Sequence, residues 1–131
     1  MRTIPIGTKA TATLVVKPEH LANRFKDSIL PLVFATPMMI LVMENAALNA
    51  IKPYLEPGES AVGTSVDVQH LSATPVGHEV RATAEVVRVE GKRIDYIVSA
   101  SDEQGEIGKG THQRIVIDLA SFNERLARKS K

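Results

Sequence analysis

Three residues of this chain, Thr36, Glu44 and His70, have side chains suited to acid–base or nucleophilic chemistry. Glu44 stands out because it directly follows an unbroken apolar run from Met38 to Met43. Burying a carboxylate is costly unless it is partnered or protonated, so a glutamate in such a setting is often functional. The alternative is that Glu44 lies on a strip that faces solvent or a subunit partner, and the helix alone does not separate the two.

Thr36 and His70 each have a structural explanation as well as a functional one. Thr36 precedes Pro37, and this pair is typical of a helix start, because the threonine hydroxyl can accept from a free backbone N–H. His70 lies near the end of a strand-like run, where alternation places it on one face with Val62, Thr64, Val66 and Val68. A single histidine on such an apolar face is more often a core residue than a catalyst.

The segment from Thr36 to Ile51 predicts a long helix that carries two of these residues. Its first two turns are apolar on every side, which predicts burial all round inside the protein. The apolar run is shorter than the roughly 20 residues that cross a bilayer. Pro53 discourages a helical conformation in the residue before it, so the helix should end there. In an ideal helix Thr36 and Glu44 lie about 12 Å apart along the axis. They can therefore meet only if the first turn is irregular or a two-fold axis brings Thr36 or His70 from a partner.

Strand-like runs flank this helix. Residues 8–16 are rich in β-branched side chains and predict one strand before it, and residues 19–26 predict one or two helical turns. Four further strands are predicted after the helix, at residues 60–72, 78–90, 92–102 and 106–117. The joints between them are short and rich in turn-forming residues, so the four strands should run antiparallel and form a β-meander.

Asp118 is predicted to cap a last amphipathic helix of about ten residues, with Leu119, Phe122 and Leu126 at helical spacing. The order of elements fits an α+β architecture in which one antiparallel β-sheet wraps around a long central helix, the hotdog fold, in a single domain over residues 1–131. A sheet of about five strands leaves edges that invite pairing, so we expect a homodimer or a dimer of dimers.

Composition excludes several classes of function. The chain has 131 residues, of which 24% are charged, and a formal net charge of +1, so we expect neither a nucleic acid nor a membrane as its partner. It contains no cysteine, which excludes disulfides and thiol nucleophiles. Its histidines and carboxylates show no metal-ligand spacing, so we expect no metal. The first residues lack the apolar core of a signal peptide, which predicts a cytoplasmic location.

Taken together, the motifs resemble one known family. Thr36-Pro37, Glu44, Gly63-Thr64, His70 and the turn Thr74-Pro75-Val76-Gly77 occur in an order and spacing similar to those of the fluoroacetyl-CoA thioesterases. The resemblance extends from about Val33 to Asp118. It implies a hotdog-fold enzyme that hydrolyses the thioester bond of a small acyl-CoA to the free acid and CoA. CoA would then be part of the substrate, and no cofactor is expected.

The resemblance also implies roles for particular residues. Thr36, Glu44 and His70 match the three catalytic positions, Gly63 matches a backbone position that faces the thioester, and Arg114 matches an arginine near the site. Glu44 would act as nucleophile or general base, and His70 would orient or deprotonate water. The Thr36 hydroxyl and the free N–H groups at the helix start would polarise the thioester carbonyl.

Other functions on the same fold remain possible at this level. One is a module that binds acyl-CoA or another small ligand without catalysis, and another is an enoyl-CoA hydratase. The phenylalanine lid associated with fluoroacetyl selectivity has no clear counterpart between Asp27 and Leu30, so the sequence predicts thioester hydrolysis without specifying the acyl group.

Overall fold

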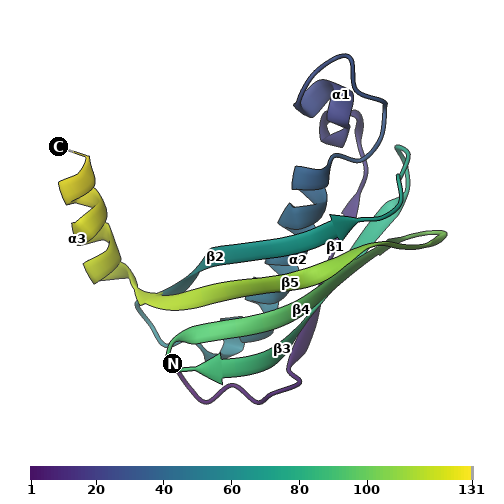
Figure 1. The fold of residues 1–131 in the computed structure, drawn as a ribbon. Helices are drawn as coiled ribbons and strands as arrows, with labels where there is room; N and C mark the ends of the chain where they lie inside the picture. The colour runs from purple at the N-terminus through teal and green to yellow at the C-terminus, as the bar shows by residue number, and fades with distance from the viewer. Residues whose placement is uncertain (131) are drawn as a thin grey trace.

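A computed structural model describes residues 1–130 of the chain (Figure 1). The elements are, in order, β1 (Lys9–Val15), the short 3-10 turn η1 (Pro18–His20), α1 (Ala22–Phe25), α2 (Thr36–Ile51), a second 3-10 turn η2 (Lys52–Tyr54), β2 (Glu59–His70), β3 (Glu79–Glu90), β4 (Arg93–Asp102), β5 (Gly105–Asp118) and α3 (Leu119–Lys129). The helix and the strands expected from the sequence are all present, with boundaries within about two residues.

The five strands form one antiparallel sheet in the order β1-β3-β4-β5-β2, and α2 lies against its concave face (Figure 1). The buried side of α2 carries three alanines, Ala46, Ala47 and Ala50, which let the helix approach the sheet closely. Larger side chains of the helix, such as Met39 and Met43, fill the remaining space in the same core. The predicted α+β architecture, a sheet wrapped around one long helix, is confirmed.

The predicted four-stranded meander is wrong in one place, because β2 pairs with β5 and not with β3. The segment between β2 and β3 does not reverse as a tight turn. It is held across the end of the sheet by Thr74, which is fully buried and donates from Oγ1 to Asp102 Oδ2 at 2.8 Å. The backbone N–H of Phe34 also donates to the Thr74 carbonyl at 2.8 Å. The chain therefore crosses the sheet end, and only β3, β4 and β5 form a meander.

The expectation that α2 is buried all round is also wrong for a single chain. Leu41 is 42% exposed, and Thr36 and Pro37 at the start of the helix are exposed as well. The physical reason is that α2 packs mainly on β1 and β3, while β2 covers less of it. A strip of the helix on the side of β2 is left open.

A β-bulge between Gly63 and Ser65 interrupts the regular alternation of β2. Beyond the bulge, Val66 pairs with the buried His112 and therefore faces the helix, as predicted for this part of the strand. Before the bulge, Val62 pairs with Ile115 and lies on the opposite face. The predicted single face from Val62 to His70 thus holds only for the second half of the strand, because one extra residue reverses the alternation.

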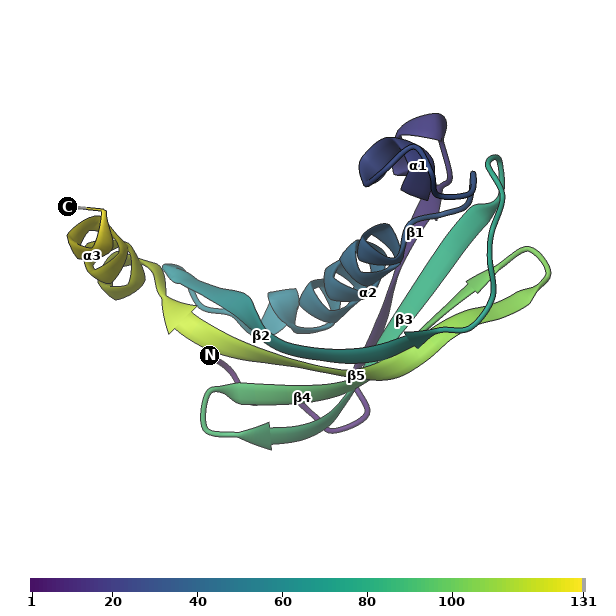
Figure 2. The same cartoon turned by 45° about the horizontal axis from the view of Figure 1, so that its top comes forward.

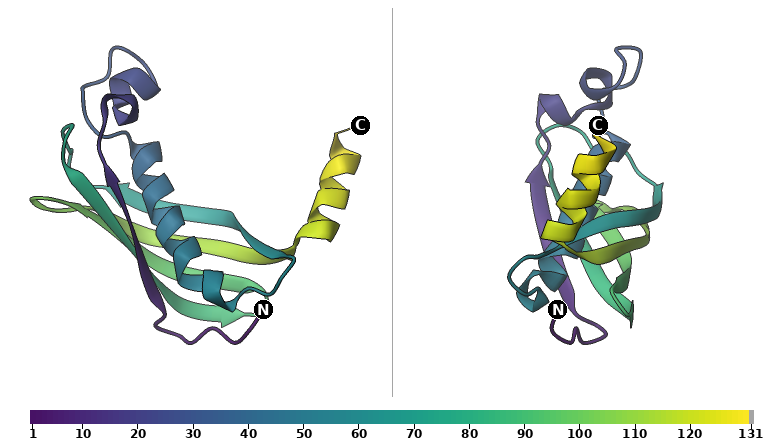
Figure 3. Two further views of the ribbon diagram at one scale, coloured as in Figure 1. Left: turned by 180° about the vertical axis from the view of Figure 1, so that it is seen from behind. Right: turned by 90° about the vertical axis from the view of Figure 1, so that its left-hand side faces the viewer.

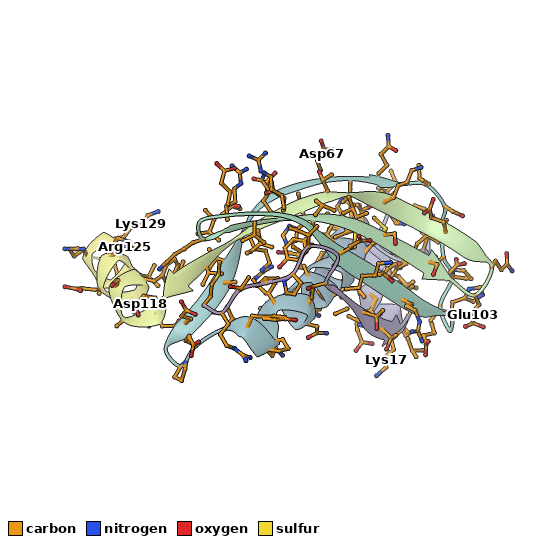
Figure 4. All side chains as sticks on the ribbon, turned by 90° about the horizontal axis from the view of Figure 1, so that it is seen from below. Lys17, Asp67, Glu103, Asp118, Arg125 and Lys129 are labelled. Carbon is orange, nitrogen blue, oxygen red and sulfur yellow. The ribbon has the colours of Figure 1, made fainter. Side chains whose placement is uncertain are left out.

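The last helix begins as predicted, since Asp118 Oδ2 accepts from the backbone N–H of Ser121 at 3.0 Å. The helix α3 then extends away from the sheet, at the end of the molecule opposite α1 (Figures 2 and 3). None of its side chains, all of which lie in the described part of the chain, is buried, and Leu126 is 51% exposed. Arg125 and Lys129 point outward from it (Figure 4). Within residues 1–130, no helix is both long and apolar enough to cross a membrane.

Candidate active site

Thr36 and His70 form a hydrogen-bonded pair although 34 residues separate them in the chain. Thr36 is the first residue of α2 and His70 the last of β2, and Thr36 Oγ1 lies 2.8 Å from His70 Nδ1. The cap of α2 is Ala35, and no side chain caps the helix. The structural explanation for Thr36, a capping hydroxyl, is therefore wrong, and the hydroxyl instead faces a titratable ring.

The environment of His70 favours the neutral form of its ring. Burial of the imidazole lowers the pKa of His70 below its usual value, and the nearby Ser72 backbone opposes this shift in part. Nδ1 points to Thr36, whereas Nε2 is buried and has no hydrogen-bond partner among residues 1–130. Nδ1 is therefore the ring nitrogen that His70 presents to Thr36.

Glu44 lies two turns further along α2 and faces a different set of residues. Its Oε2 atom is 3.5 Å from Nη1 of the buried Arg114 on β5. The side chain of Glu44 is 37% exposed, so the carboxylate is paired on one side and open on the other. Glu44 is thus neither enclosed by apolar groups nor free on the surface. An ion pair of this kind suits a carboxylate that must stay available to react.

Gly63 lies directly beneath the Glu44 carboxylate. A Cβ atom at this position would lie 2.8 Å from Glu44 Oε2, closer than non-bonded atoms approach. The absence of a side chain at Gly63 is therefore what allows Glu44 to lie against β2. Gly63 therefore lies beside the bulge of β2 and also against Glu44, the residue of the predicted site that is closest to it.

Arg114 is held in place by two further contacts. Its Nη2 donates to the Ala61 carbonyl at 2.8 Å, and its Nη1 lies 3.3 Å from Nε2 of His112. His112 is a member of this group that the sequence analysis did not single out. The available signal was its spacing from Arg114, because residues two apart on a strand face the same side.

The five predicted residues therefore form two groups within one chain. Thr36 contacts His70, and Glu44 lies with Gly63 and Arg114. The helix α2 is a regular α-helix from Thr36 onward, which excludes an irregular first turn as a way to join the groups. About 12 Å of helix axis separates Thr36 from Glu44.

A cavity of about 350 Å³ opens beside the Thr36–His70 pair. Besides these two residues, its walls include Leu30, Phe34 and Leu71, so it offers a small and mostly apolar space next to the hydroxyl. A larger hollow of about 640 Å³ lies among residues such as Asp67 and Thr111, and none of the five predicted residues lines it. Of these two hollows, the smaller one is therefore the one that adjoins predicted site residues. Within the part of the chain that the structure describes, no group of three or more histidine and acidic side chains could hold a metal ion.

Comparison with known proteins gives one consistent result. The model of the family of fluoroacetyl-CoA-specific thioesterases matches residues 16–120. A fluoroacetyl-CoA thioesterase from Streptantibioticus cattleyicolor is 44% identical over 130 residues, which cover 95% of this chain and 94% of that protein.

Solved structures agree with this result. The structure of the fluoroacetyl-CoA thioesterase FlK is similar to this chain with a TM-score of 0.92 and 42% identity, covering 97% of this chain and 98% of that one. A member of the thioesterase superfamily from Thermus thermophilus is 33% identical, with a TM-score of 0.91 and coverage of 99% and 96%.

Proposed function

The chain belongs to the family of fluoroacetyl-CoA-specific thioesterases, and we propose that it hydrolyses the thioester bond of a small acyl-CoA at a site built from Thr36, His70 and Glu44. The observation that carries this proposal is the 2.8 Å hydrogen bond between Thr36 Oγ1 and His70 Nδ1. It places a polarising hydroxyl beside a cavity whose volume, about 350 Å³, suits a small acyl group.

In this proposal Thr36 and His70 hold the thioester carbonyl. The neutral His70 ring donates from Nδ1 to Thr36 Oγ1, which leaves the hydroxyl hydrogen free to point at the carbonyl oxygen. The helix start offers fewer further donors than the sequence suggested, because Pro37 has no N–H and the N–H groups of Met38 and Met39 donate to the Ala35 carbonyl. Besides the hydroxyl, this leaves the backbone N–H of Thr36 for the carbonyl oxygen. Negative charge that develops on the oxygen during attack is thereby stabilised.

Glu44 is the group that we assign to the proton transfers. Its carboxylate accepts a proton from water as the water oxygen bonds to the carbonyl carbon. When the carbon–sulfur bond breaks, the same proton passes to the departing thiolate, so that the products are the free acid and CoA. Arg114, 3.5 Å away, holds the carboxylate in position between these steps.

The separation of Glu44 from Thr36 leads to the second part of the proposal, a homodimer formed through β2. Thr36 lies over His70 at one end of β2, and Glu44 lies over Gly63 toward the other. A two-fold axis midway between these ends exchanges them. It therefore places Glu44 of the partner subunit beside the Thr36–His70 pair, and each dimer has two complete sites.

Several surfaces support pairing at this edge. The strand β2 is an edge of the sheet, and Val66 near its middle is 41% exposed. Leu41 on the open strip of α2 is exposed on the same side. At one end of β2, the apolar side of α3 is uncovered, and at the other end Leu32 and Leu71 are exposed. The two-fold axis would bring each helix α3 onto the exposed apolar residues of its partner. A dimer of dimers and a cytoplasmic location both remain predictions.

The test is release of free CoA, detected with a thiol reagent, from a panel of short acyl-CoA esters that includes acetyl-, fluoroacetyl- and propionyl-CoA. We expect hydrolysis by the native protein and none by a Glu44→Ala variant. Asp67→Ala is the matched control, because Asp67 is exposed on the outer face of β2, away from α2 (Figure 4). Binding of acyl-CoA without release of CoA, or hydration of crotonyl-CoA without release, would overturn the proposal.

A further inference from the structure

His112 lies at the centre of the group around Arg114 and has no part in the mechanism described so far. It is 2% exposed on β5. Its ring stacks on Tyr96 of β4, with centroids 5.6 Å apart and planes at 19°. Its two nitrogens each face a polar partner: Nδ1 lies 2.8 Å from the Ser65 carbonyl, and Nε2 lies 3.3 Å from Nη1 of Arg114.

These two partners require the same form of the ring. A carbonyl oxygen can only accept, so Nδ1 must carry the hydrogen that points to Ser65. A guanidinium can only donate, so Nε2 must present its lone pair to Arg114. The neutral ring with hydrogen on Nδ1 satisfies both contacts. A protonated ring would instead set an N–H against the N–H of Arg114.

We propose that His112 is a positioning residue that holds Arg114 against Glu44. The guanidinium nitrogen Nη1 of Arg114 contacts both Nε2 of His112 and Oε2 of Glu44. The other terminal nitrogen, Nη2, donates a hydrogen bond to the Ala61 carbonyl. Without an acceptor at His112, Nη1 keeps only its contact with Glu44. The guanidinium plane is then free to tilt, and the carboxylate loses its fixed place. This inference rests on the proposed function, because it assigns Glu44 to the reaction.

The charges around His112 favour the neutral ring. Burial lowers the pKa of His112, and the positive charge of Arg114 lowers it further, while the Ser65 carbonyl and the negative charge of Glu44 act in the opposite direction. Tyr96, on the neighbouring strand, presents its ring, and burial raises the pKa of its phenol, so Tyr96 brings no charge at neutral pH. The protonation state that the hydrogen bonds require is therefore the one that the surroundings stabilise.

Gly63 lies next to both His112 and Glu44. A Cβ atom at Gly63 would lie 3.3 Å from Cε1 of His112 and 2.8 Å from Oε2 of Glu44. The imidazole and the carboxylate thus share the space above this one residue. A histidine that merely filled the core would not need its nitrogen directed at this space.

Three substitutions separate the two hydrogen bonds of His112. In His112→Gln, the amide oxygen can stand near the place of Nε2 and accept from Arg114. In His112→Asn, the amide nitrogen can stand near the place of Nδ1 and donate to Ser65, but no acceptor reaches Arg114. His112→Phe keeps a ring against Tyr96 and makes neither bond.

We expect kcat for CoA release to fall roughly tenfold to hundredfold in His112→Asn and His112→Phe, as for loss of a hydrogen bond to a charged group. His112→Gln should stay within a few-fold of the native rate, and KM should change little in all three. Adding His112→Asn to Arg114→Met should cost almost nothing further, since the two residues act as one unit. Equal losses in the Asn and Gln variants, or additive losses in the double variant, would overturn the inference.

Nuclear magnetic resonance of the native protein gives a second readout that needs neither activity nor a folded variant. The ring nitrogen and carbon shifts of His112 at neutral pH should show the neutral form with hydrogen on Nδ1. Hydrogen on Nε2, or a doubly protonated ring, would refute the inference even if the enzyme is active. The expected ring form in a protein that releases no CoA would instead refute the proposed thioesterase function, while the contact between His112 and Arg114 stands.

Discussion

Replacing Gly63 by alanine tests how closely the site depends on the position of one carboxylate. The new Cβ atom would lie 2.8 Å from Glu44 Oε2 and 3.3 Å from His112 Cε1. A carbon–oxygen contact needs about 3.3 Å or more, so the carboxylate must move by roughly 0.5 Å or beyond. It can move outward, because the Glu44 side chain is 37% exposed, but the movement takes it away from Arg114.

The expected result is a loss of activity without a loss of stability. A shift of about 1 Å in a reacting group can lower the rate about a hundredfold, so we expect kcat/KM to fall between roughly tenfold and a hundredfold. The free energy of unfolding should change by about 1 kcal/mol or less, because the clash is with the end of a flexible side chain. The assay is CoA release at several substrate concentrations, together with urea unfolding of the same samples.

Gly110→Ala is the matched control for this variant. A Cβ atom at Gly110 would clash with the Asp67 backbone carbonyl, which cannot move without disturbing the strand. This variant should lose stability in proportion to any loss of activity. Native-like activity in Gly63→Ala, or a loss of activity that only follows unfolding, would contradict the assigned place of Glu44.

Three further results are expected. Thr36→Val keeps the shape of an exposed side chain but removes the hydroxyl, so kcat should fall by about tenfold or more. The melting temperature, measured by calorimetry, should stay near the native value. An unchanged kcat would exclude Thr36 from the mechanism. Burial lowers the pKa of both His70 and His112, so between about pH 7 and pH 5 the unfolded chain binds protons that the folded chain does not. Stability to urea should therefore fall as the pH falls, less steeply in His112→Gln, and equal slopes in the two proteins would contradict this assignment. Because the chain has no cysteine, a Leu126→Cys chain and a Leu32→Cys chain can be mixed and oxidised. If α3 covers the partner subunit, they should form a covalent dimer on a denaturing gel, whereas Arg125→Cys in place of Leu126→Cys, as the control, should not. A dimer that is stable in sedimentation but is not linked would refute the contact.

Much of the architecture could be read from local patterns. The helix α2 follows from Thr36-Pro37 and its apolar run, and the cap at Asp118 follows from a short-range hydrogen bond to Ser121. The pairing of β2 with β5 could not be read in the same way. The segment that carries the chain from β2 to β3 is held by Thr74 against Asp102, a contact between segments 28 residues apart that no local pattern indicates.

The site shows the same division. The order of Thr36, Glu44, Gly63 and His70 in the sequence was enough to bring them under consideration. The sequence did not indicate which of these residues contact one another. The bulge beside Gly63 reverses the alternation of β2, and the open strip of α2 depends on where the sheet curves. His112 was not predicted as a site residue, because its place in the site depends on hydrogen bonds to Ser65 and Arg114 and not on its neighbours in the chain.

The central claim, that a complete site joins Thr36 and His70 of one subunit to Glu44 of the other, can be tested by mixing two inactive variants. Glu44→Ala and His70→Ala chains are unfolded together in equal amounts and refolded. About half of the dimers should then be mixed, and each mixed dimer contains one intact site and one doubly altered site. The account predicts CoA release at about one quarter of the native rate per chain. No recovery above either variant alone would contradict it, since every site would then lie within a single chain.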